Sequence, residues 1–236
     1  MERIDISRKN DIKTLVLQDF ISRINVNPST GLTREDAIAR RALYGSNRVT
    51  PPLQCPSWIC CLLPCVTRIP SMVAYRQALP IKATVRRQSD HFKGSHIVHM
   101  SPASLVYGDV VEIYEKDVVP ADLRVIKCSY NCVVDQAVLL PHFSKVEKAS
   151  QTGLDNGDQE ESVRILNNHG LEGDLEQQAH GHLKQVSVWT TNHDSLKSCN
   201  ILLMGTRVIN GTATGVVIAT GDQTQWGQLI SLNRWP

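Results

Sequence analysis

The residue whose type and setting best suit acid–base chemistry is a histidine near the end of the stretch VVDQAVLLPHFSK. A neutral imidazole accepts a proton near pH 7, so His142 could serve as a general base at the tip of a loop. Its neighbours are Leu140, Pro141 and Phe143, and none of them carries a carboxylate that would orient the ring. We therefore expect an exposed loop histidine and assign it no catalytic role.

Metal ligation is the second chemistry that the residue types permit. Four histidines lie in one polar stretch: His169, His180, His182 and His193. Four cysteines crowd into a short apolar stretch: Cys55, Cys60, Cys61 and Cys65. The histidine spacing matches no standard metal site, so we favour a solvated loop. The cysteines could be palmitoylated or bind a soft metal, but we favour a buried or interfacial apolar segment. No metal site or bound cofactor is predicted.

Composition excludes several classes of protein. The chain has 25 basic and 23 acidic residues, no basic run and few aromatic residues, so it is not expected to bind nucleic acid. Hydrophobic residues make up 42% of the chain, which argues against overall disorder. The charged start lacks the apolar core of a signal peptide, and the number of cysteines is odd, so reduced thiols are expected rather than disulfides.

Two amphipathic helices are predicted between residues 11 and 50. In the first, DIKTLVLQDFISRI, apolar residues recur with the helical period. The second opens at Thr33, an N-cap residue followed by acidic residues, and is expected to end near Gly45. Helices of this length bury little surface alone, so we expect them to dock on a larger domain.

The segment 53–80 is rich in proline and cysteine. No residue from Val49 to Thr67 is charged, but four prolines interrupt this stretch. Backbone groups freed by proline would stay unpaired in lipid, so a transmembrane helix is not expected. We expect weak contact with a membrane surface instead. The side chains that would make it are Trp58, Cys60, Cys61 and Cys65.

From about residue 81 the pattern changes to short β-branched runs between turn residues: KATVRR, DVVEIY, ADLRVI, NCVVDQAVLL, NILLMGTRVI and GTATGVVIAT. Such runs predict a compact all-β core. Between about 146 and 198 the sequence turns polar, which predicts a long disordered insertion in a loop.

Three of these blocks, in this order, carry a family resemblance: SLVYGDVVEIYEKDVVPADLRVI, VVDQAVLL and CNILLMGTRVINGTATGVVIATGDQTQWGQLI. With LTREDAIARRALYGSNRVTPP ahead of them, the chain resembles the N-terminal region and actuator domain of P-type cation-transporting ATPases. The resemblance implies an α+β chain with a helical region over 1–52 and an actuator-like, distorted jelly-roll domain over 81–236. The linker 53–80 takes the place of the first membrane hairpin. The family usually has Gly-Asp where this chain has Lys116-Asp117; if that turn needs a positive φ, Lys116 costs roughly 1 kcal/mol.

The same resemblance bears on His142. In the family, a strand containing Val-Asp leads to a Thr-Gly-Glu-Ser loop, whose glutamate positions the water that hydrolyses the aspartyl-phosphate. Val134, Asp135 and Leu139 match that strand. The loop then falls on four replaced positions: Leu140, Pro141, His142 and Phe143. The resemblance therefore implies a degenerate loop with no catalytic residue.

Two family features are absent from the sequence, namely the Asp-Lys-Thr-Gly-Thr phosphorylation motif and an ATP-binding domain. ATP and Mg²⁺ are implied for a full-length pump, and ATPase activity is not expected of this chain alone. The expected role is the actuator portion of a cation pump at the cytosolic face of a membrane, with the remaining pump domains as partners. Because the chain stops at NRWP, where a pump would continue, we expect a piece of a pump or a degenerate relative. A non-catalytic, actuator-derived regulatory or interaction module is the alternative, and a metal-binding domain is the third.

Overall fold

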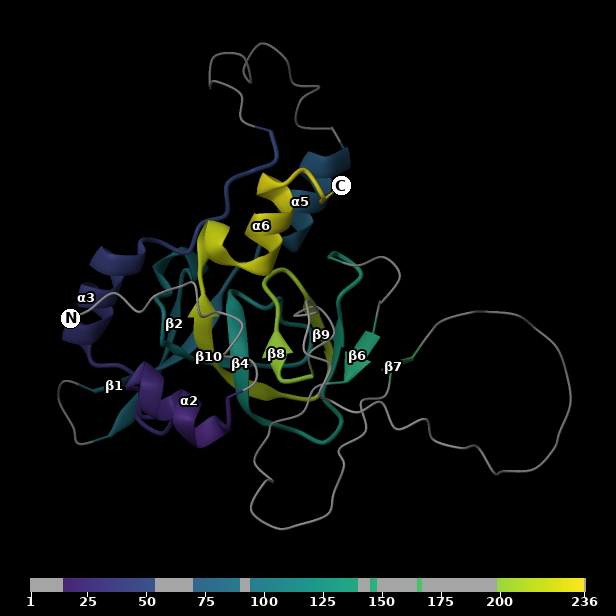
Figure 1. Cartoon of the computed structure of the whole chain (residues 1–236). Coiled ribbons are helices and arrows are strands. Elements are labelled where there is room, and N and C mark those ends of the chain that lie inside the picture. Colours follow the sequence, from purple (N-terminus) through teal and green to yellow (C-terminus); the bar gives the residue numbers. More distant parts are fainter. Residues whose placement is uncertain are drawn as a thin grey trace, which may run out of the picture.

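The architecture is a pair of helices followed by two antiparallel sheets, with two more helices at one end (Figure 1). The computed structural model describes residues 15–53, 70–89, 94–139 and 199–235, together with the strand backbone at 145–147 and 165–166. This arrangement is the predicted α+β class, with a helical N-terminal region ahead of an actuator-like β domain.

The two N-terminal helices are α2 (Leu17–Ile24) and α3 (Arg34–Tyr44). Thr33 caps α3, because its Oγ1 accepts a hydrogen bond of 3.1 Å from the Asp36 amide. The helix ends at Gly45, which has a φ of 80°. The second predicted helix is confirmed at both ends. The first is confirmed over Leu17–Ile24; residues 15 and 16 precede the helix, and residues 11–14 lie outside the described residues.

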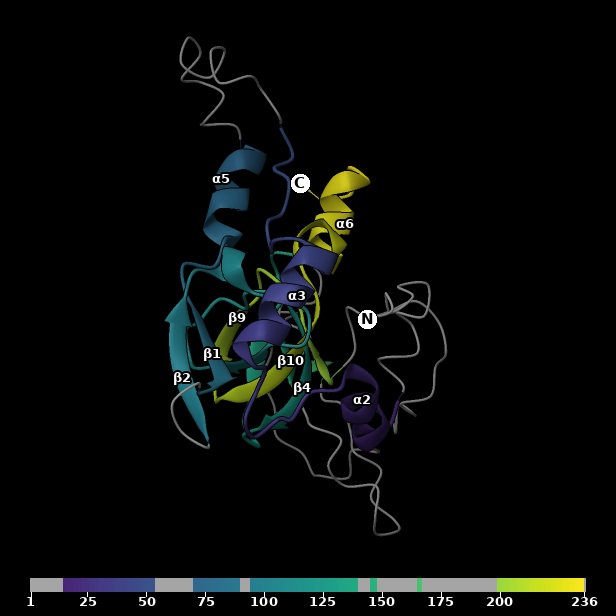
Figure 2. The same cartoon turned by 90° about the vertical axis from the view of Figure 1, so that its left-hand side faces the viewer.

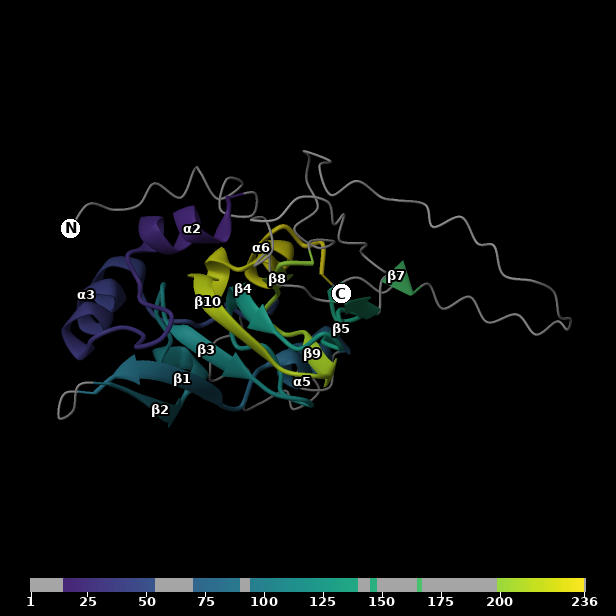
Figure 3. The same ribbon diagram turned by 90° about the horizontal axis from the view of Figure 1, so that it is seen from below.

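The larger sheet has the strand order β2-β1-β3-β10-β4-β8, and each neighbouring pair is antiparallel. Its strands are β1 (Ala83–Gln88), β2 (Ser95–Met100), β3 (Val110–Ile113), β4 (Asp122–Cys128), β8 (Ile201–Leu202) and β10 (Ala213–Ala219). Figure 3 shows β10 lying between β3 and β4, far from both in sequence.

The smaller sheet has the order β7-β6-β5-β9. Its strands are β5 (Val133–Asp135), β6 (Lys145–Glu147), β7 (Ile165–Leu166) and β9 (Arg207–Asn210). Two of them, β6 and β7, fall at or inside the range 146–198 where the sequence predicts a disordered insertion, so short strand pairing occurs there. The rest of that range lies outside the described residues, as do the four histidines named above.

Three elements differ from the sequence-based expectation. Strand β2 was not predicted, because SHIVHM mixes polar and apolar residues on an exposed edge strand. The segment predicted as a linker contains the helix α5 (Pro70–Ala78), in which proline occupies the first position. The single run NILLMGTRVI is split between β8 and β9 by a turn at Gly205, which has a φ of 85°.

The turn at Lys116-Asp117 has the positive φ that the sequence left open. Lys116 has a φ of 71°, so the turn does take the left-handed conformation that glycine would adopt without strain. The turn is closed by the Asp117 amide, which donates to the Tyr114 carbonyl at 3.0 Å.

The core has three parts. Residues of both sheets form the central cluster, for example Val85, Val111, Leu123, Val134 and Val208. The helices α2 and α3 pack on the larger sheet through a second cluster that includes Phe20, Ile24, Ala37, Val110 and Val216. Figure 2 shows α2 and α3 beside this sheet.

The third cluster lies where α5 and α6 (Gln225–Ser231) meet the domain. Thr224 caps α6 by accepting a hydrogen bond of 3.1 Å from the Gly227 amide. Residues 49–53, α5, α6 and the C-terminal stretch lie together at this end of the domain (Figures 1 and 2). Among the helices described, none has the length and apolar character needed to cross a bilayer.

Candidate functional site

The candidate loop follows β5. Its four positions, Leu140 to Phe143, lie outside the described residues, and so do Trp58, Cys60, Cys61 and Cys65. The structure describes the turn that leads to the loop, residues Gln136–Leu139, which we call the base turn.

The base turn is closed by hydrogen bonds at both ends. At its start, Asp135 Oδ1 accepts a bond of 2.8 Å from the Ala137 amide. At its end, the Leu139 amide donates to the Gln136 carbonyl at 2.9 Å. The side chains of Gln136 and Leu139 are buried, as is that of Val134 in β5. The positions that match the family strand therefore have structural roles. Val134 packs in the central cluster and Leu139 in the third cluster, and Asp135 caps the turn.

An aromatic cluster made of Tyr75, Trp226 and Trp235 packs beside the base turn. The Trp226 ring lies 5.2 Å from the Tyr75 ring and 5.6 Å from the Trp235 ring, the second pair being edge-to-face. The indole Nε1 of Trp235 donates to the Val138 carbonyl at 2.8 Å. Sequence reasoning missed this contact, because it joins positions 97 apart and leaves no periodic pattern. The only signal was two tryptophans close together in a chain poor in aromatic residues.

Residues 49–53, which follow the N-terminal region, are held by hydrogen bonds at the same end of the domain as the aromatic cluster. The Thr50 amide donates to Asp222 Oδ1 at 2.6 Å, and Thr50 Oγ1 donates to Oδ2 at 2.7 Å. The Tyr75 hydroxyl donates to the Val49 carbonyl at 2.6 Å. Burial, with a smaller contribution from Asp222, raises the pKa of Tyr75 above its ordinary value, so this hydroxyl stays a donor.

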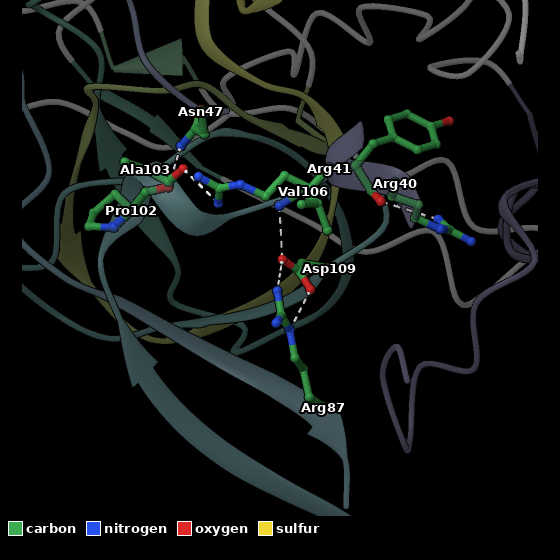
Figure 4. A network of polar contacts seen from close by, with 9 residues as sticks. Arg40, Arg41, Asn47, Arg87, Pro102, Ala103, Val106 and Asp109 are labelled. Carbon is green, nitrogen blue, oxygen red and sulfur yellow. Dashed lines mark hydrogen bonds and ion pairs between the residues drawn. The ribbon is translucent and has the colours of Figure 1, made fainter. Parts of the chain in front are cut away.

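Asn47 joins the N-terminal region to the β domain (Figure 4). Its Nδ2 donates to the Pro102 carbonyl at 3.0 Å and to the Pro120 carbonyl at 2.7 Å. Its Oδ1 accepts a bond of 2.8 Å from the Gly221 amide. All three contacts are buried, so this one side chain connects the segment after α3 to three separate segments of the β domain.

Arg40 makes a second connection from α3. Its guanidinium donates to the Tyr107 carbonyl at 3.2 Å and to the Ile24 and Asn25 carbonyls at the end of α2 at 3.0 and 3.3 Å. Arg40 is 5% exposed. Gly108 has a φ of 88°, which favours glycine, and a Cβ there would also lie 2.0 Å from the Arg40 guanidinium and displace it.

Asp109 closes the turn that contains Gly108. Its carboxylate accepts two hydrogen bonds from Arg87, at 3.0 and 2.8 Å, and one of 2.9 Å from the Val106 amide (Figure 4). Burial raises the pKa of Asp109, and the bonds from Arg87 and Val106 act against that rise. A carboxylate with three donors around it holds the turn together and leaves little room for acid–base chemistry.

Asp122, the first residue of β4, has a comparable role near the start of α6. It accepts a bond of 2.9 Å from the Met204 amide and one of 2.7 Å from the Gln225 amide at the start of α6. Both buried aspartates therefore stabilise turns and helix ends. In the described part of the chain, no three His, Cys, Asp or Glu side chains are grouped to hold a metal ion.

Comparison with known proteins gives two family matches. Residues 79–234 match the model of the P-type ATPase actuator domain, and residues 12–63 match the N-terminus of cation transporters and ATPases. Similar proteins include the potassium-transporting ATPase alpha chain 1 of Xenopus laevis, 30% identical over 161 residues. They also include sodium/potassium-transporting ATPase subunit alpha-2, 28% identical in Gallus gallus and 29% in Homo sapiens over the same length.

Each of these alignments covers 68% of the present chain, and the chain spans only 11% of the length of each relative. The actuator match covers well over half of the chain and takes in α6 and every strand of both sheets, and it begins directly after α5. The N-terminal match includes α2, α3 and Asn47, the residue that joins them to the β domain. The chain therefore belongs to the P-type cation-transporting ATPase family, of which it carries the N-terminal region and the actuator domain.

Proposed function

We propose that this chain acts as the actuator part of a P-type cation pump, coupling the phosphorylation state of the pump to movement of its membrane helices. The observation that carries the proposal is that residues 49–53, α5 and the stretch after α6 all lie at one end of the domain. A domain whose connections share one end can turn as a rigid body and move all of them together. The membrane helices would be attached through these connections, with the domain on the cytosolic side.

ATP and Mg²⁺ belong, in this proposal, to other domains of the pump. The relatives are ATPases by name. This chain has neither the phosphorylation motif nor a nucleotide-binding region in its sequence. Its contribution is mechanical, and the remaining pump domains are its partners.

We further propose that the loop at Leu140, Pro141, His142 and Phe143 is degenerate. A carboxylate at the third position would hold the attacking water, and a glycine at the second would let the backbone approach the phosphoryl group. Proline is stiffer than glycine and has no N–H to donate, and the leucine and phenylalanine carry no hydroxyl. A pump with this loop should form its phosphoenzyme normally and lose the phosphate slowly.

The test is the decay of the labelled phosphoenzyme after an ATP chase, in a pump polypeptide that contains this chain. Restoring Leu140→Thr, Pro141→Gly, His142→Glu and Phe143→Ser together should speed decay by about a hundredfold or more, the usual effect of a general base. His142→Ala alone should change the rate little. A large slowing in His142→Ala would instead make the histidine the base.

The alternative function is a non-catalytic, actuator-derived module that regulates or binds a pump. The replacement of all four loop positions favours it, because such a module has no need of the glutamate. The same experiment separates the two functions. In the alternative, restoring the four residues leaves phosphoenzyme decay unchanged, because the loop does not reach the phosphoryl group.

We also propose that Trp58, Cys60, Cys61 and Cys65 give the chain a weak contact with the membrane surface. The apolar run there is short and broken by proline, so binding should need acylation or stay reversible. Carbonate extraction of membranes should release the chain. Resistance that persists after Cys60, Cys61 and Cys65 are changed to Ser would show a spanning segment and contradict the proposal.

A further inference from the structure

The stretch after α6 turns back onto the domain. The Asn233 amide donates to the Ile230 carbonyl at 3.0 Å, and the Arg234 amide donates to the Leu229 carbonyl at 2.9 Å. These two bonds form a Schellman motif, which reverses the chain after a helix. Asn233 has the positive φ of 52° that the motif requires, and asparagine tolerates it better than most residues. The reversal brings Trp235 against the base turn.

Trp235 holds the base turn in two ways. Its Nε1 donates to the Val138 carbonyl at 2.8 Å, one residue before the turn ends. Trp235 is 7% exposed and belongs to the same apolar cluster as Leu139, which is 5% exposed. Both the main chain and a side chain of the base turn are therefore held by a residue that follows α6.

The same tryptophan is connected to α5. Its ring meets Trp226 edge-to-face, and Trp226 packs on Tyr75 of α5. Tyr75 in turn donates its hydroxyl hydrogen to the Val49 carbonyl. The aromatic cluster thus touches all three segments at this end of the domain: residues 49–53, α5 and the stretch after α6.

We infer that Trp235 is a positioning residue: through Val138 it sets the conformation of the base turn and couples that turn to α5 and residues 49–53. A displacement of α5 or residues 49–53 is then transmitted to Leu139, the residue directly before the candidate loop. The inference rests on the proposed function only for its use in a pump. The contact and the coupling belong to the chain itself and can be measured in it.

Amide hydrogen exchange on the purified chain, followed by NMR, tests the contact. Trp235→Phe keeps an aromatic ring and removes the donor to Val138. Exchange of the Leu139 amide should become about three- to tenfold faster, the range expected for the loss of one hydrogen bond. The Val125 amide, which donates to Asn200 in the central part of the domain, should be unaffected. Unchanged exchange at Leu139, or equal acceleration at both amides, would overturn the inference.

Trp226→Phe is the matched control, because the Trp226 indole N–H, within the described part of the chain, has no hydrogen-bond partner. That ring is fully buried, so its truncation should speed exchange at Leu139 and Val125 alike. Of the two tryptophan variants, only Trp235→Phe should act selectively on the Leu139 amide. Selective acceleration of Leu139 in Trp226→Phe would show that ring packing, and not the bond to Val138, holds the turn.

The unaltered chain provides a second measurement in case Trp235→Phe fails to fold. The indole N–H of Trp235 and the Leu139 amide should show comparable protection and respond together to added urea. An indole N–H that exchanges as in a free tryptophan, beside a protected Leu139, would rule out the inferred role.

Coupling to α5 is tested with Tyr75→Phe, which removes only the donor to Val49. It should speed Leu139 exchange in the unaltered chain and have little further effect in Trp235→Phe, because the effect passes through Trp235. Additive effects would show that α5 is not coupled to the base turn by this route. None of these exchange measurements involves phosphorylation. A negative result here would therefore overturn the role of Trp235 and leave the proposed function untouched, and a negative phosphoenzyme experiment would do the reverse.

Discussion

Glu112, in β3, shows how surroundings set the charge state of a single side chain. It accepts hydrogen bonds from Arg86 on β1, of which the one from Nε measures 3.1 Å, and one of 2.7 Å from the Tyr114 hydroxyl. Burial acts to raise the pKa of Glu112, but the bonds from Tyr114 and Arg86 outweigh it and hold the pKa below its ordinary value. The carboxylate is therefore more stable as an anion in the folded chain than in the unfolded chain.

This lowered pKa predicts a pH-dependent contribution to stability. The carboxylate stabilises the fold above the unfolded pKa of about 4.3, and the contribution is lost as the pH falls through the lower folded pKa. Glu112→Gln should lower the free energy of unfolding by about 1–2 kcal/mol at pH 7, with a difference that shrinks below pH 4. Urea denaturation of both proteins at pH 7 and below pH 4 measures this difference in the free energy of unfolding.

Glu115→Gln is the control for that prediction. Glu115 is about half exposed and lies 3.8 Å from the exposed Lys116, a surface pair expected to contribute almost nothing. An equal loss of stability in both variants, or a Glu112→Gln effect that is constant with pH, would contradict the assignment.

At the scale of elements, the N-terminal region is held to the β domain by a few side chains. Asn47 and Arg40 supply the buried contacts, and the pair Thr50–Asp222 supplies an exposed one just before residues 51–53 leave the domain. The helix α2 also buries Phe20 and Ile24 against the larger sheet, and α3 buries Ala37. Apolar packing therefore carries most of the docking energy, while the polar bonds fix its register.

Removing the Thr50–Asp222 contact should loosen the connecting segment without unfolding the domain. Thr50→Val removes the hydroxyl donor and keeps the backbone bond, whereas Asp222→Ala removes both acceptors. We expect losses of about 0.5–1 kcal/mol and about 1–2 kcal/mol respectively, by urea denaturation. Exchange of the Thr50 amide should be faster only in Asp222→Ala. The double variant should be no less stable than Asp222→Ala alone, and additive losses would show that the two residues act separately.

For the whole molecule, local patterns in the sequence predicted most of the elements. Helical periodicity and the Thr33 cap gave α2 and α3, and β-branched runs gave the central strands. Strand β2 was not predicted because an edge strand needs no apolar face. Helix α5 was not predicted because its sequence follows a proline-rich stretch and has no capping signal.

The anchors of the candidate site could not be predicted for a different reason. The bonds from Trp235 to Val138 and from Thr50 to Asp222 join positions 97 and 172 residues apart. Such contacts depend on the assembled fold and leave no periodic trace in the chain. The loop positions themselves came from family resemblance, because four unlike residues such as Leu, Pro, His and Phe carry no pattern of their own.

The purified chain as a whole is expected not to react with ATP. The two aspartates that are buried in the described part of the β domain, Asp109 and Asp122, accept hydrogen bonds from backbone amides or Arg87, so neither is presented as a nucleophile. The sequence also lacks the motif in which the family phosphorylates aspartate. Incubation with labelled ATP and Mg²⁺ should therefore leave no acid-stable label on the chain and release no phosphate above background. A full-length cation pump treated in parallel supplies the positive control. Label that stays on this chain at acid pH and is released by hydroxylamine would mark an aspartyl-phosphate, and the actuator assignment would then fail to describe its chemistry.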